Sequence, residues 1–198
     1  MLNYVHGGDI QTYIDRHGFA PLDLSANINP FGIPDAVRAA MHRAVDNCTQ
    51  YPDPFCRAAR QAIGAREGVN PDFLYCGNGA ADVLDRLAAV LKPRKVLLTA
   101  PTFAEYERTL SGAEIRVLCG KRTALRSQSV FWTRFHRIWM RCISATNNPT
   151  GRTAQLELLR EIVRKCTENG VKLVVDECFN DFLTDERHTE RPAGIIPV

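Results

Sequence analysis

An acid at the end of an apolar run is the first feature of this sequence that could do chemistry. Residues Val171–Val175 are mostly apolar and are followed by Asp176 and Glu177. Such a run indicates a strand buried on both faces of a parallel sheet, and open α/β sheets bind ligands beyond the carboxyl ends of their strands. We therefore expect the Asp176 carboxylate at a ligand site, or else at a strand end where it only caps the next element.

A glycine turn is the second such feature. Phe73–Cys76 is typical of a strand, Gly77-Asn78-Gly79 of a turn, and the residues that follow of an amphipathic helix. Glycines let backbone N–H groups close around an anion, and a helix N-terminus adds partial positive charge. The turn therefore predicts a phosphate site, with simple packing of a strand against a helix as the alternative. A dinucleotide fold is disfavoured, because Asp82 replaces the third glycine and no acid follows about 20 residues on.

The elements that must position these residues alternate along the chain. Residues 1–33 are expected to form a loop-like N-terminal arm, and residues 34–198 the main domain. The alternation favours an α/β fold, a three-layer α/β/α unit with a mostly parallel sheet. Helices are expected at 35–47, 54–67, after Gly79, shortly before Gly112 and at 154–169, and strands at 73–76, 95–99, 115–118 and 171–176.

The composition is that of an ordinary globular protein, with 45% hydrophobic and 24% charged residues. No apolar run approaches the roughly 20 residues of a membrane span, and the first residues show no secretion signal. The seven cysteines are odd in number and lack C-x-x-C spacing, which favours reduced thiols over disulfides or a metal site. We expect a cytoplasmic protein that binds neither a membrane nor a metal.

The charge is distributed unevenly. Residues 115–156 contain no acid and eight basic residues, so the rest of the chain is net negative. Such a segment can indicate nucleic-acid binding, but no binding module surrounds it and its flanks are acidic, so we expect no nucleic-acid partner. Residues 121–146 also contain both tryptophans and fit neither a helical nor a strand period. We predict that 121–146 are translated out of frame, which the neighbouring reading frames of the nucleotide sequence would test.

Several motifs together resemble one enzyme family. Asn147-Asn148-Pro149-Thr150-Gly151, Asp176-Glu177 and the glycine turn look like the large domain of fold type I pyridoxal-phosphate enzymes, the aminotransferase class I/II superfamily. Four further motifs are His6-Gly7-Gly8, Ser25–Gly32, Tyr51-Pro52-Asp53-Pro54 and Phe179-x-Asp181-Phe182. Within the superfamily, they resemble the threonine-phosphate decarboxylases of cobalamin biosynthesis, which are related to the histidinol-phosphate aminotransferases.

The resemblance implies a cofactor, pyridoxal 5′-phosphate, and a role for each matching residue. Asp176 would face the protonated ring nitrogen, since the cofactor acts as an electron sink when that nitrogen carries a proton. Asn148 would hydrogen-bond the ring oxygen, and the backbone N–H groups of Gly79 and Ala80 would hold the phosphate. Phe103 would stack on the ring, unless it is only a core aromatic.

The resemblance also implies residues outside the sheet and a second subunit. Tyr51 matches a tyrosine that reaches the cofactor phosphate of the neighbouring subunit, which implies a homodimer. His6 and Asn27 match positions that contact the substrate, His6 near its phosphate. Both can instead be turn residues, as His and Asn often are in loops.

The implied reaction is decarboxylation of L-threonine O-3-phosphate to aminopropanol phosphate. His6-Gly7-Gly8 and Phe179 favour it. The related aminotransferases generally lack the His-Gly-Gly motif and have tyrosine at the position of Phe179. Transamination of histidinol phosphate is the alternative. A non-catalytic relic that binds partners through the old subunit interface is a third.

The family pattern differs from this chain in two places. The family generally has Asn-Pro where this chain has Ala145-Thr146. It also continues well beyond the Asp-Glu strand, so we expect the cofactor-binding domain to be incomplete and the small C-terminal domain to be absent. The lysine that holds the cofactor as a Schiff base lies in that later region, whereas all five lysines here precede Asp176. We therefore expect no catalytic residue, and an inactive fragment.

Overall fold

The computed structural model describes residues 7–119, 140–144 and 146–183 and divides the chain into two compact units, 1–54 and 55–198. The arm expected over 1–33 falls within the first unit, which extends further, to Pro54. His6 and most of the segment 121–146 lie outside the described residues. In the part of the chain that is described, no helix is long and apolar enough to cross a membrane.

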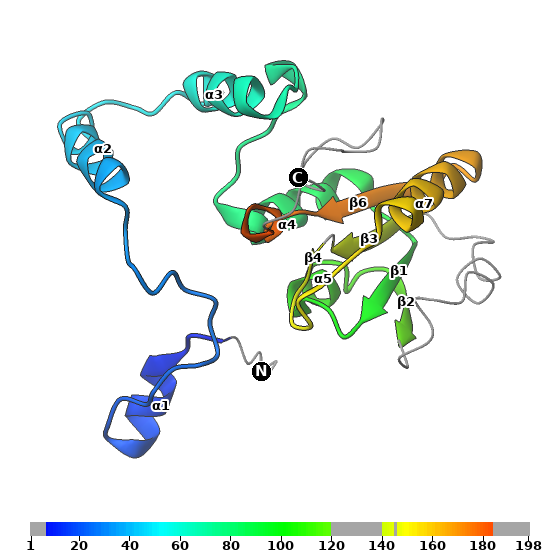
Figure 1. Ribbon diagram of the computed structural model, residues 1–198, viewed down its shortest axis with the longest axis horizontal. Coiled ribbons are helices and arrows are strands. Elements are labelled where there is room, and N and C mark those ends of the chain that lie inside the picture. Colours follow the sequence, from blue (N-terminus) through cyan, green and yellow to red (C-terminus); the bar gives the residue numbers. More distant parts are fainter. Residues whose placement is uncertain (1–6, 120–139, 145, 184–198) are drawn as a thin grey trace. The chain divides into compact units, whose positions relative to one another are not determined.

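The first unit contains two helices, α1 (Ile10–His17) and α2 (Asp35–Val45) (Figure 1). Helix α2 begins where the sequence predicts it. Helix α1 corrects the prediction that residues 1–33 are loop-like. Its ends are set locally: the Asp9 carboxylate accepts a hydrogen bond from the Thr12 N–H (3.1 Å), and Gly18 ends the helix in the left-handed conformation.

The second unit opens with helix α3 (Arg57–Glu67) and a 3₁₀ turn, η1 (Pro71–Phe73). Two boundary predictions are wrong here. Helix α3 begins at Arg57 rather than Pro54, because Cys56 has a left-handed backbone (φ 48°) that no helix starting earlier could include. Residues 73–76 form no strand, because Asn70 and Pro71 build the turn first: the Asn70 side chain accepts a hydrogen bond from the Asp72 N–H at 2.9 Å.

A four-stranded parallel sheet forms the centre of the second unit, with strand order β2-β1-β3-β6. This confirms the predicted parallel sheet. A separate short pair, β4 (Thr146–Asn147) with β5 (Arg152–Thr153), is antiparallel. The sheet strands are β1 (Lys95–Ala100), β2 (Glu114–Cys119), β3 (Met140–Ser144) and β6 (Lys172–Asp176).

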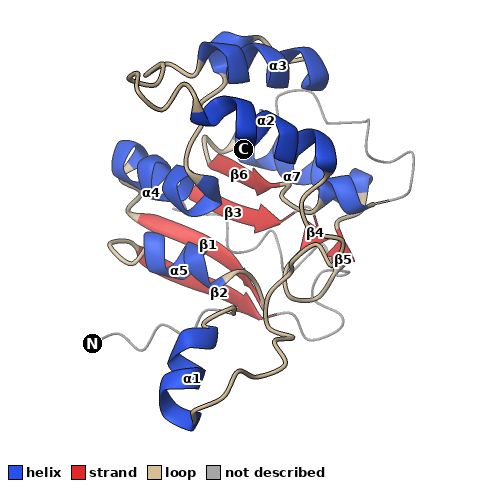
Figure 2. Ribbon diagram, turned by 90° about the vertical axis from the view of Figure 1, so that its left-hand side faces the viewer, coloured by secondary structure: helices blue, strands red, loops and turns tan. Residues whose placement is uncertain are grey.

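Helices cover the sheet on both faces, as the prediction of three layers requires. Helices α4 (Gly79–Leu91) and α5 (Ala104–Thr109) lie on one face and α7 (Leu156–Glu168) on the other (Figures 1 and 2). The side chains of β1 alternate accordingly. Val96 and Leu98 join the apolar cluster of α4 and α5, whereas Leu97 joins that of α7. The last element described is a 3₁₀ turn, η2 (Asn180–Phe182).

Strand β3 lies inside the segment for which the sequence showed no period. Met140–Ser144 occupy the position between β1 and β6, and Met140 is buried. Pattern analysis missed the strand because Arg141 interrupts an already short apolar run. The out-of-frame origin of 121–146 stays a prediction.

Candidate active site at the carboxyl edge of the sheet

The predicted residues of the second unit converge on the carboxyl edge of the sheet. Strands β1, β3 and β6 are parallel, and Ser144 at the end of β3 pairs with Asp176 at the end of β6. Phe103 therefore leaves the sheet at the same edge as Asn148, each a few residues beyond its own strand. The carboxyl edge of a parallel sheet is where α/β folds bind ligands.

Helix α4 places its first residues at this edge too. It ends at Leu91, and a short turn leads into β1 at Lys95, so its C-terminal end lies at the amino edge. Its 13 residues and the six of β1 each span about 20 Å, at roughly 1.5 Å per helical and 3.3 Å per strand residue. Because α4 packs along β1 with Leu84 and Val96 in one cluster, its start, Gly79 and Ala80, lies near the carboxyl edge.

Asp176 is held by two neighbours. The Tyr106 hydroxyl donates a hydrogen bond to its Oδ2 (2.5 Å), and the Cys178 backbone N–H donates one to its Oδ1 (2.9 Å). Tyr106 is only 1% exposed, so this phenol is fixed in the core while Asp176 itself is half-buried. A carboxylate accepts about four hydrogen bonds. Asp176 is thus oriented and retains acceptor capacity for a further donor.

The thiol of Cys178 depends on the same carboxylate. Burial of its sulfur, together with a hydrogen bond to Asp176 and the negative charge there, raises the pKa of Cys178 to about 12. The protonated thiol is therefore a further donor toward Asp176 at neutral pH. Because the thiolate is the reactive form of cysteine, the raised pKa disfavours Cys178 as a nucleophile at neutral pH.

The glycine turn before α4 is shaped by two close contacts. A Cβ at Gly77 would lie 2.7 Å from Cγ2 of Val83 and 2.9 Å from Oδ2 of Asp82, so a larger residue would displace one of these side chains. The Asn78 N–H donates to Asp82 Oδ2 (2.9 Å), whereas Gly79 has a left-handed backbone (φ 79°) with open space around its Cβ position. The start of α4 therefore offers N–H groups and room for an anion.

The loop after β1 and strand β4 are joined by one side chain, that of Asn147. The Asn147 amide donates to the Pro101 carbonyl (3.0 Å) and to Thr150 Oγ1 (2.9 Å), which joins the loops after β1 and β4. Its Oδ1 and the Thr102 hydroxyl are buried without a hydrogen-bond partner among the described residues. Unsatisfied buried polar atoms are uncommon in folded proteins, and these two lie in β4 and in the loop after β1, at the expected ligand site. The neighbouring Asn148 is half-buried.

Phe103 lies at the start of α5, as its N-cap residue. Its ring meets that of Tyr106 edge to face, with centroids 5.8 Å apart, and packs at the margin of the apolar cluster. Phe103 is therefore half-buried rather than a fully enclosed core aromatic. A partly uncovered ring beside Tyr106 is available to stack on a planar ligand.

Asn27 and Tyr51 belong to the first unit, where both are exposed. There the two N-terminal motifs contact each other. A Cβ at Gly7 would lie 2.0 Å from the Ser25 carbonyl oxygen, and the Gly8 N–H donates to Ser25 Oγ (2.8 Å). Both glycines of the His-Gly-Gly motif thus contact the residue two positions before Asn27.

Tyr106 is one of three residues of the site that sequence reasoning missed. Its signal was an aromatic three residues after Phe103, which in a helix places both on adjacent turns of one face. That spacing alone could not show that the Tyr106 hydroxyl reaches an acid 70 residues later in the chain. Thr102 and Cys178 were passed over for the same reason, because their contacts depend on strand order.

No lysine in the described residues lies at this edge by position along its element. Lys172 opens β6 and is four residues from Asp176, more than about 10 Å along a strand at roughly 3.3 Å per residue. Lys95 opens β1 and pairs with Glu114 (2.9 Å), Lys92 caps the C-terminal end of α4, and Lys165 lies in α7, 3.8 Å from Glu168. Lys121 is outside the described residues.

The sequence of residues 20–195 matches the family described as aminotransferase class I and II. The threonine-phosphate decarboxylase of Salmonella typhimurium (strain LT2) is 34% identical over 210 residues, covering 100% of this chain and 54% of that protein. A histidinol-phosphate aminotransferase of Geobacillus sp. (strain WCH70) is 28% identical, with 91% and 51% covered. The chain spans about half the length of these curated relatives.

Solved structures share the fold. The histidinol-phosphate aminotransferase from Sinorhizobium meliloti, in complex with pyridoxal-5′-phosphate, aligns with a TM-score of 0.80 at 19% identity, over 96% of this chain and 52% of that one. The L-threonine-O-3-phosphate decarboxylase from Porphyromonas gingivalis aligns with a TM-score of 0.67 at 20% identity, over 77% and 45%. At these identities the likeness shows the fold, and it confirms the predicted α/β class.

Proposed function

Because the chain belongs to the aminotransferase class I and II family, we propose that its second unit binds pyridoxal 5′-phosphate at the carboxyl edge of the sheet. The observation that carries this proposal is the Asp176 carboxylate, oriented by Tyr106 and by the Cys178 N–H with acceptor capacity left over. A protonated ring nitrogen is the kind of donor that such a carboxylate takes.

The other residues suit the remaining parts of the cofactor. The N–H groups of Gly79 and Ala80, at the start of a 13-residue helix, suit its phosphate. The half-buried Phe103 ring suits the face of the pyridine, and the Asn148 amide suits the ring oxygen. When bound, the cofactor supplies an electron sink for the pair that remains when a substrate carboxylate leaves as CO₂. The protein supplies orientation and charge around it.

We propose the phosphorylated amino acid L-threonine O-3-phosphate as the substrate of the intact enzyme, decarboxylated to aminopropanol phosphate in cobalamin biosynthesis. The printed name of the 34%-identical relative supports this choice. The His-Gly-Gly motif, which favours the same choice, contacts Ser25 through Gly7 and Gly8 and so lies close to Asn27 in the sequence of the second motif. His6 and Asn27 are the proposed substrate-binding residues.

Transamination of histidinol phosphate is the second candidate, favoured by relatives of that name. The two reactions are distinguished by product: a longer version of the protein that releases CO₂ from threonine phosphate supports the first, and one that transfers an amino group to 2-oxoglutarate supports the second. We propose a homodimer in either case, with Tyr51 reaching the cofactor phosphate of the neighbouring subunit. The full exposure of Tyr51 leaves it available for that contact.

For a polypeptide of residues 1–198 we propose cofactor binding without turnover. Every lysine precedes Asp176, and Lys172 lies at the opposite edge of the sheet. A non-catalytic role as a partner-binding chain agrees with the same observation. Borohydride reduction of the chain with pyridoxal 5′-phosphate, followed by mapping of modified lysines, should give no stoichiometric adduct at a single lysine. Such an adduct, together with turnover, would overturn this part of the proposal.

The cofactor proposal is tested by titrating the chain with pyridoxal 5′-phosphate and following its absorbance and fluorescence. Asp176→Asn removes the charge that the ring nitrogen needs and should weaken binding by about tenfold or more. Tyr106→Phe deletes one hydroxyl and should weaken it less, because the Cys178 N–H still orients the carboxylate. Glu168→Gln on α7 is the matched control and should change nothing. Equal binding by all four proteins, or none by the unmodified chain, would refute the proposal.

A further inference from the structure

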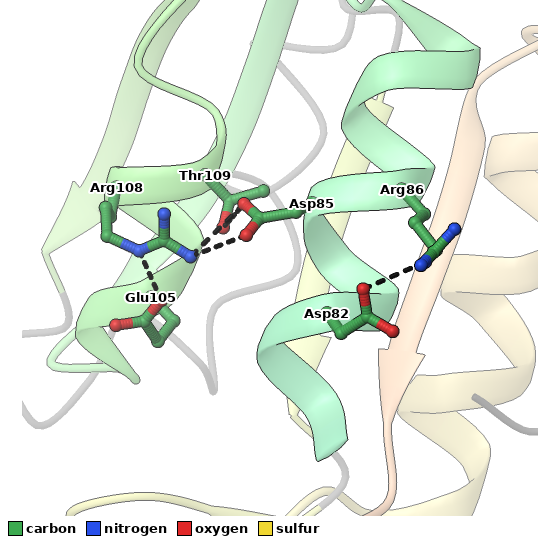
Figure 3. Close-up of polar contacts among 6 residues, drawn as sticks. All are labelled: Asp82, Asp85, Arg86, Glu105, Arg108 and Thr109. Atoms are coloured by element: carbon green, nitrogen blue, oxygen red, sulfur yellow. Dashed lines mark hydrogen bonds and ion pairs between the residues drawn. The ribbon is translucent and has the colours of Figure 1, made fainter. Parts of the chain in front are cut away.

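Helices α4 and α5 are tied together by a polar cluster centred on one acid, Asp85 (Figure 3). Asp85 lies on α4 and accepts hydrogen bonds from Arg108 Nη2 with both carboxylate oxygens, at 3.1 and 3.0 Å. The Thr109 hydroxyl donates to the same carboxylate at 3.1 Å. Two residues of α5 thus grip one side chain of α4.

Arg108 also contacts a second acid, Glu105, which is buried in the core. This carboxylate is only 4% exposed and accepts a hydrogen bond from Arg108 Nε. A buried carboxylate is stable only when a positive charge and hydrogen bonds compensate it. Arg108 therefore cannot leave Glu105 at little cost, and its guanidinium fixes the direction from which α5 reaches Asp85.

Helix α5 needs such a tie because it is short. It has six residues and no side-chain N-cap hydrogen bond, and helices of that length are not stable by themselves. Its position depends on the apolar cluster that Tyr106 shares with Leu84 of α4 and with the sheet, on the hydrogen bond from Tyr106 to Asp176, and on the polar contacts at Asp85. Apolar packing allows small sliding, whereas Arg108 contacts both oxygens of Asp85 through Nη2 and Glu105 through Nε, and these charge-assisted hydrogen bonds favour one direction and register.

The two helices carry the two ends of the proposed cofactor site. The start of α4 presents Gly79 and Ala80 for the phosphate, and the start of α5 presents Phe103 and Tyr106 for the ring and for Asp176. A ligand with a fixed span between phosphate and ring binds both ends at once only when the helices keep one spacing. Resting on the proposed function, we infer that Asp85 is a positioning residue that sets the spacing between the phosphate end and the ring end of the cofactor site.

Ligand pieces distinguish this role from a general structural one. The probes are pyridoxine 5′-phosphate, pyridoxine and inorganic phosphate, which form no covalent bond with lysine, each titrated by NMR. Asp85→Ala should weaken pyridoxine 5′-phosphate by about three- to tenfold and leave the two pieces unchanged within about twofold, because each piece contacts one helix only. Asp85→Asn keeps an acceptor for Thr109, so its affinity for pyridoxine 5′-phosphate should lie between those of the unmodified chain and of Asp85→Ala.

The control is Glu168→Ala, which breaks an exposed acid–arginine pair with Arg164 inside α7, on the other face of the sheet. It should leave all three affinities unchanged. Equal weakening of all three ligands by Asp85→Ala, or no weakening of any, overturns the inference. If the unmodified chain binds pyridoxine 5′-phosphate, and Asp85→Ala does not change its affinity relative to the affinities for pyridoxine and phosphate, only the role of Asp85 is refuted. Failure of the unmodified chain to bind it sinks the proposed function as well.

Discussion

The two units of the chain differ in what covers their apolar side chains. The second unit encloses the strands of its sheet between helices, and Leu97 in β1 is 1% exposed. In the first unit no described residue, from 7 to 54, is buried, and Leu24 is 86% exposed. Since apolar side chains gain stability only by leaving water, the second unit contains its own source of stability. The described residues of the first unit are held by local contacts alone.

The difference separates the kinds of function that each unit supports. The proposed site residues of the second unit are fixed by packing, as Tyr106 fixes Asp176. Those proposed in the first unit, Asn27 and Tyr51, are exposed in segments between its helices and after them. Preorganised sites need rigid supports, so the proposed cofactor contacts of the second unit are the part of the site that this chain builds alone. The proposed contacts of Asn27 and Tyr51 require a covering partner.

The largest expected difference between the units is in the free energy of unfolding that each loses when one leucine is truncated. Leu97→Ala opens a cavity between β1 and α7 and should lower the free energy of unfolding by about 2–5 kcal/mol. Leu24→Ala removes a side chain that already faces water and should change it by less than about 0.5 kcal/mol. Urea unfolding followed by fluorescence and circular dichroism measures both. A large loss in Leu24→Ala would mean that the first unit has a core after all.

A charge on the apolar stripe of α2 should give an intermediate effect. Val37, Met41 and Val45 are spaced four residues apart, so they line one side of the helix, and Met41 is 57% exposed. Exposed apolar stripes promote self-association. Met41→Lys should therefore raise the concentration at which the chain stays monodisperse, by about threefold or more, in sedimentation and light scattering.

Ala39→Lys is the matched control for this experiment. It adds the same charge to the opposite side of α2, where it leaves the stripe intact. Equal gains in solubility from Met41→Lys and Ala39→Lys would show that net charge, rather than the stripe, governs association. The stripe would then be no binding surface.

The sequence predicted those parts of the fold that depend on local pattern. The run from Val171 to Asp176 predicted β6, because burial on both faces leaves a near-continuous apolar signature. The period of α7 and the turn before α4 were readable for the same reason. Parallel neighbours in a sheet are distant in sequence, so no local pattern could place β3 between β1 and β6.

Some residues of the candidate site could be predicted from the sequence and others could not. Asp176, Gly79 and Asn148 were predicted from motifs and from the family resemblance, and the structure places all three in the second unit by the same sheet edge. The roles of Tyr106 and Asp85 depend on which elements lie side by side, and they became visible only with the fold. Helix α1 was missed because its signals, Asp9 and Gly18, are also ordinary turn residues.

The smallest expected effect concerns helix α1 and acid. Hydrogen bonds from Thr12, from its hydroxyl first and then from its N–H, hold the pKa of Asp9 below its usual range. A lowered pKa in the folded state means that the cap stabilises α1 above the ordinary pKa of about 3.9 and is lost as the pH falls through the lower folded value. The Cα chemical shifts of Ile10–His17 should therefore move toward random-coil values as the pH is lowered below about 4.

The control is Asp9→Asn, which keeps the capping acceptor without a charge. The Cα chemical shifts of its α1 residues should show no such transition. An unchanged transition in that variant would show that the acid sensitivity does not come from the Asp9 cap. The helix would then owe its stability to contacts other than its cap, and the contrast between a locally capped first unit and a core-packed second unit would weaken.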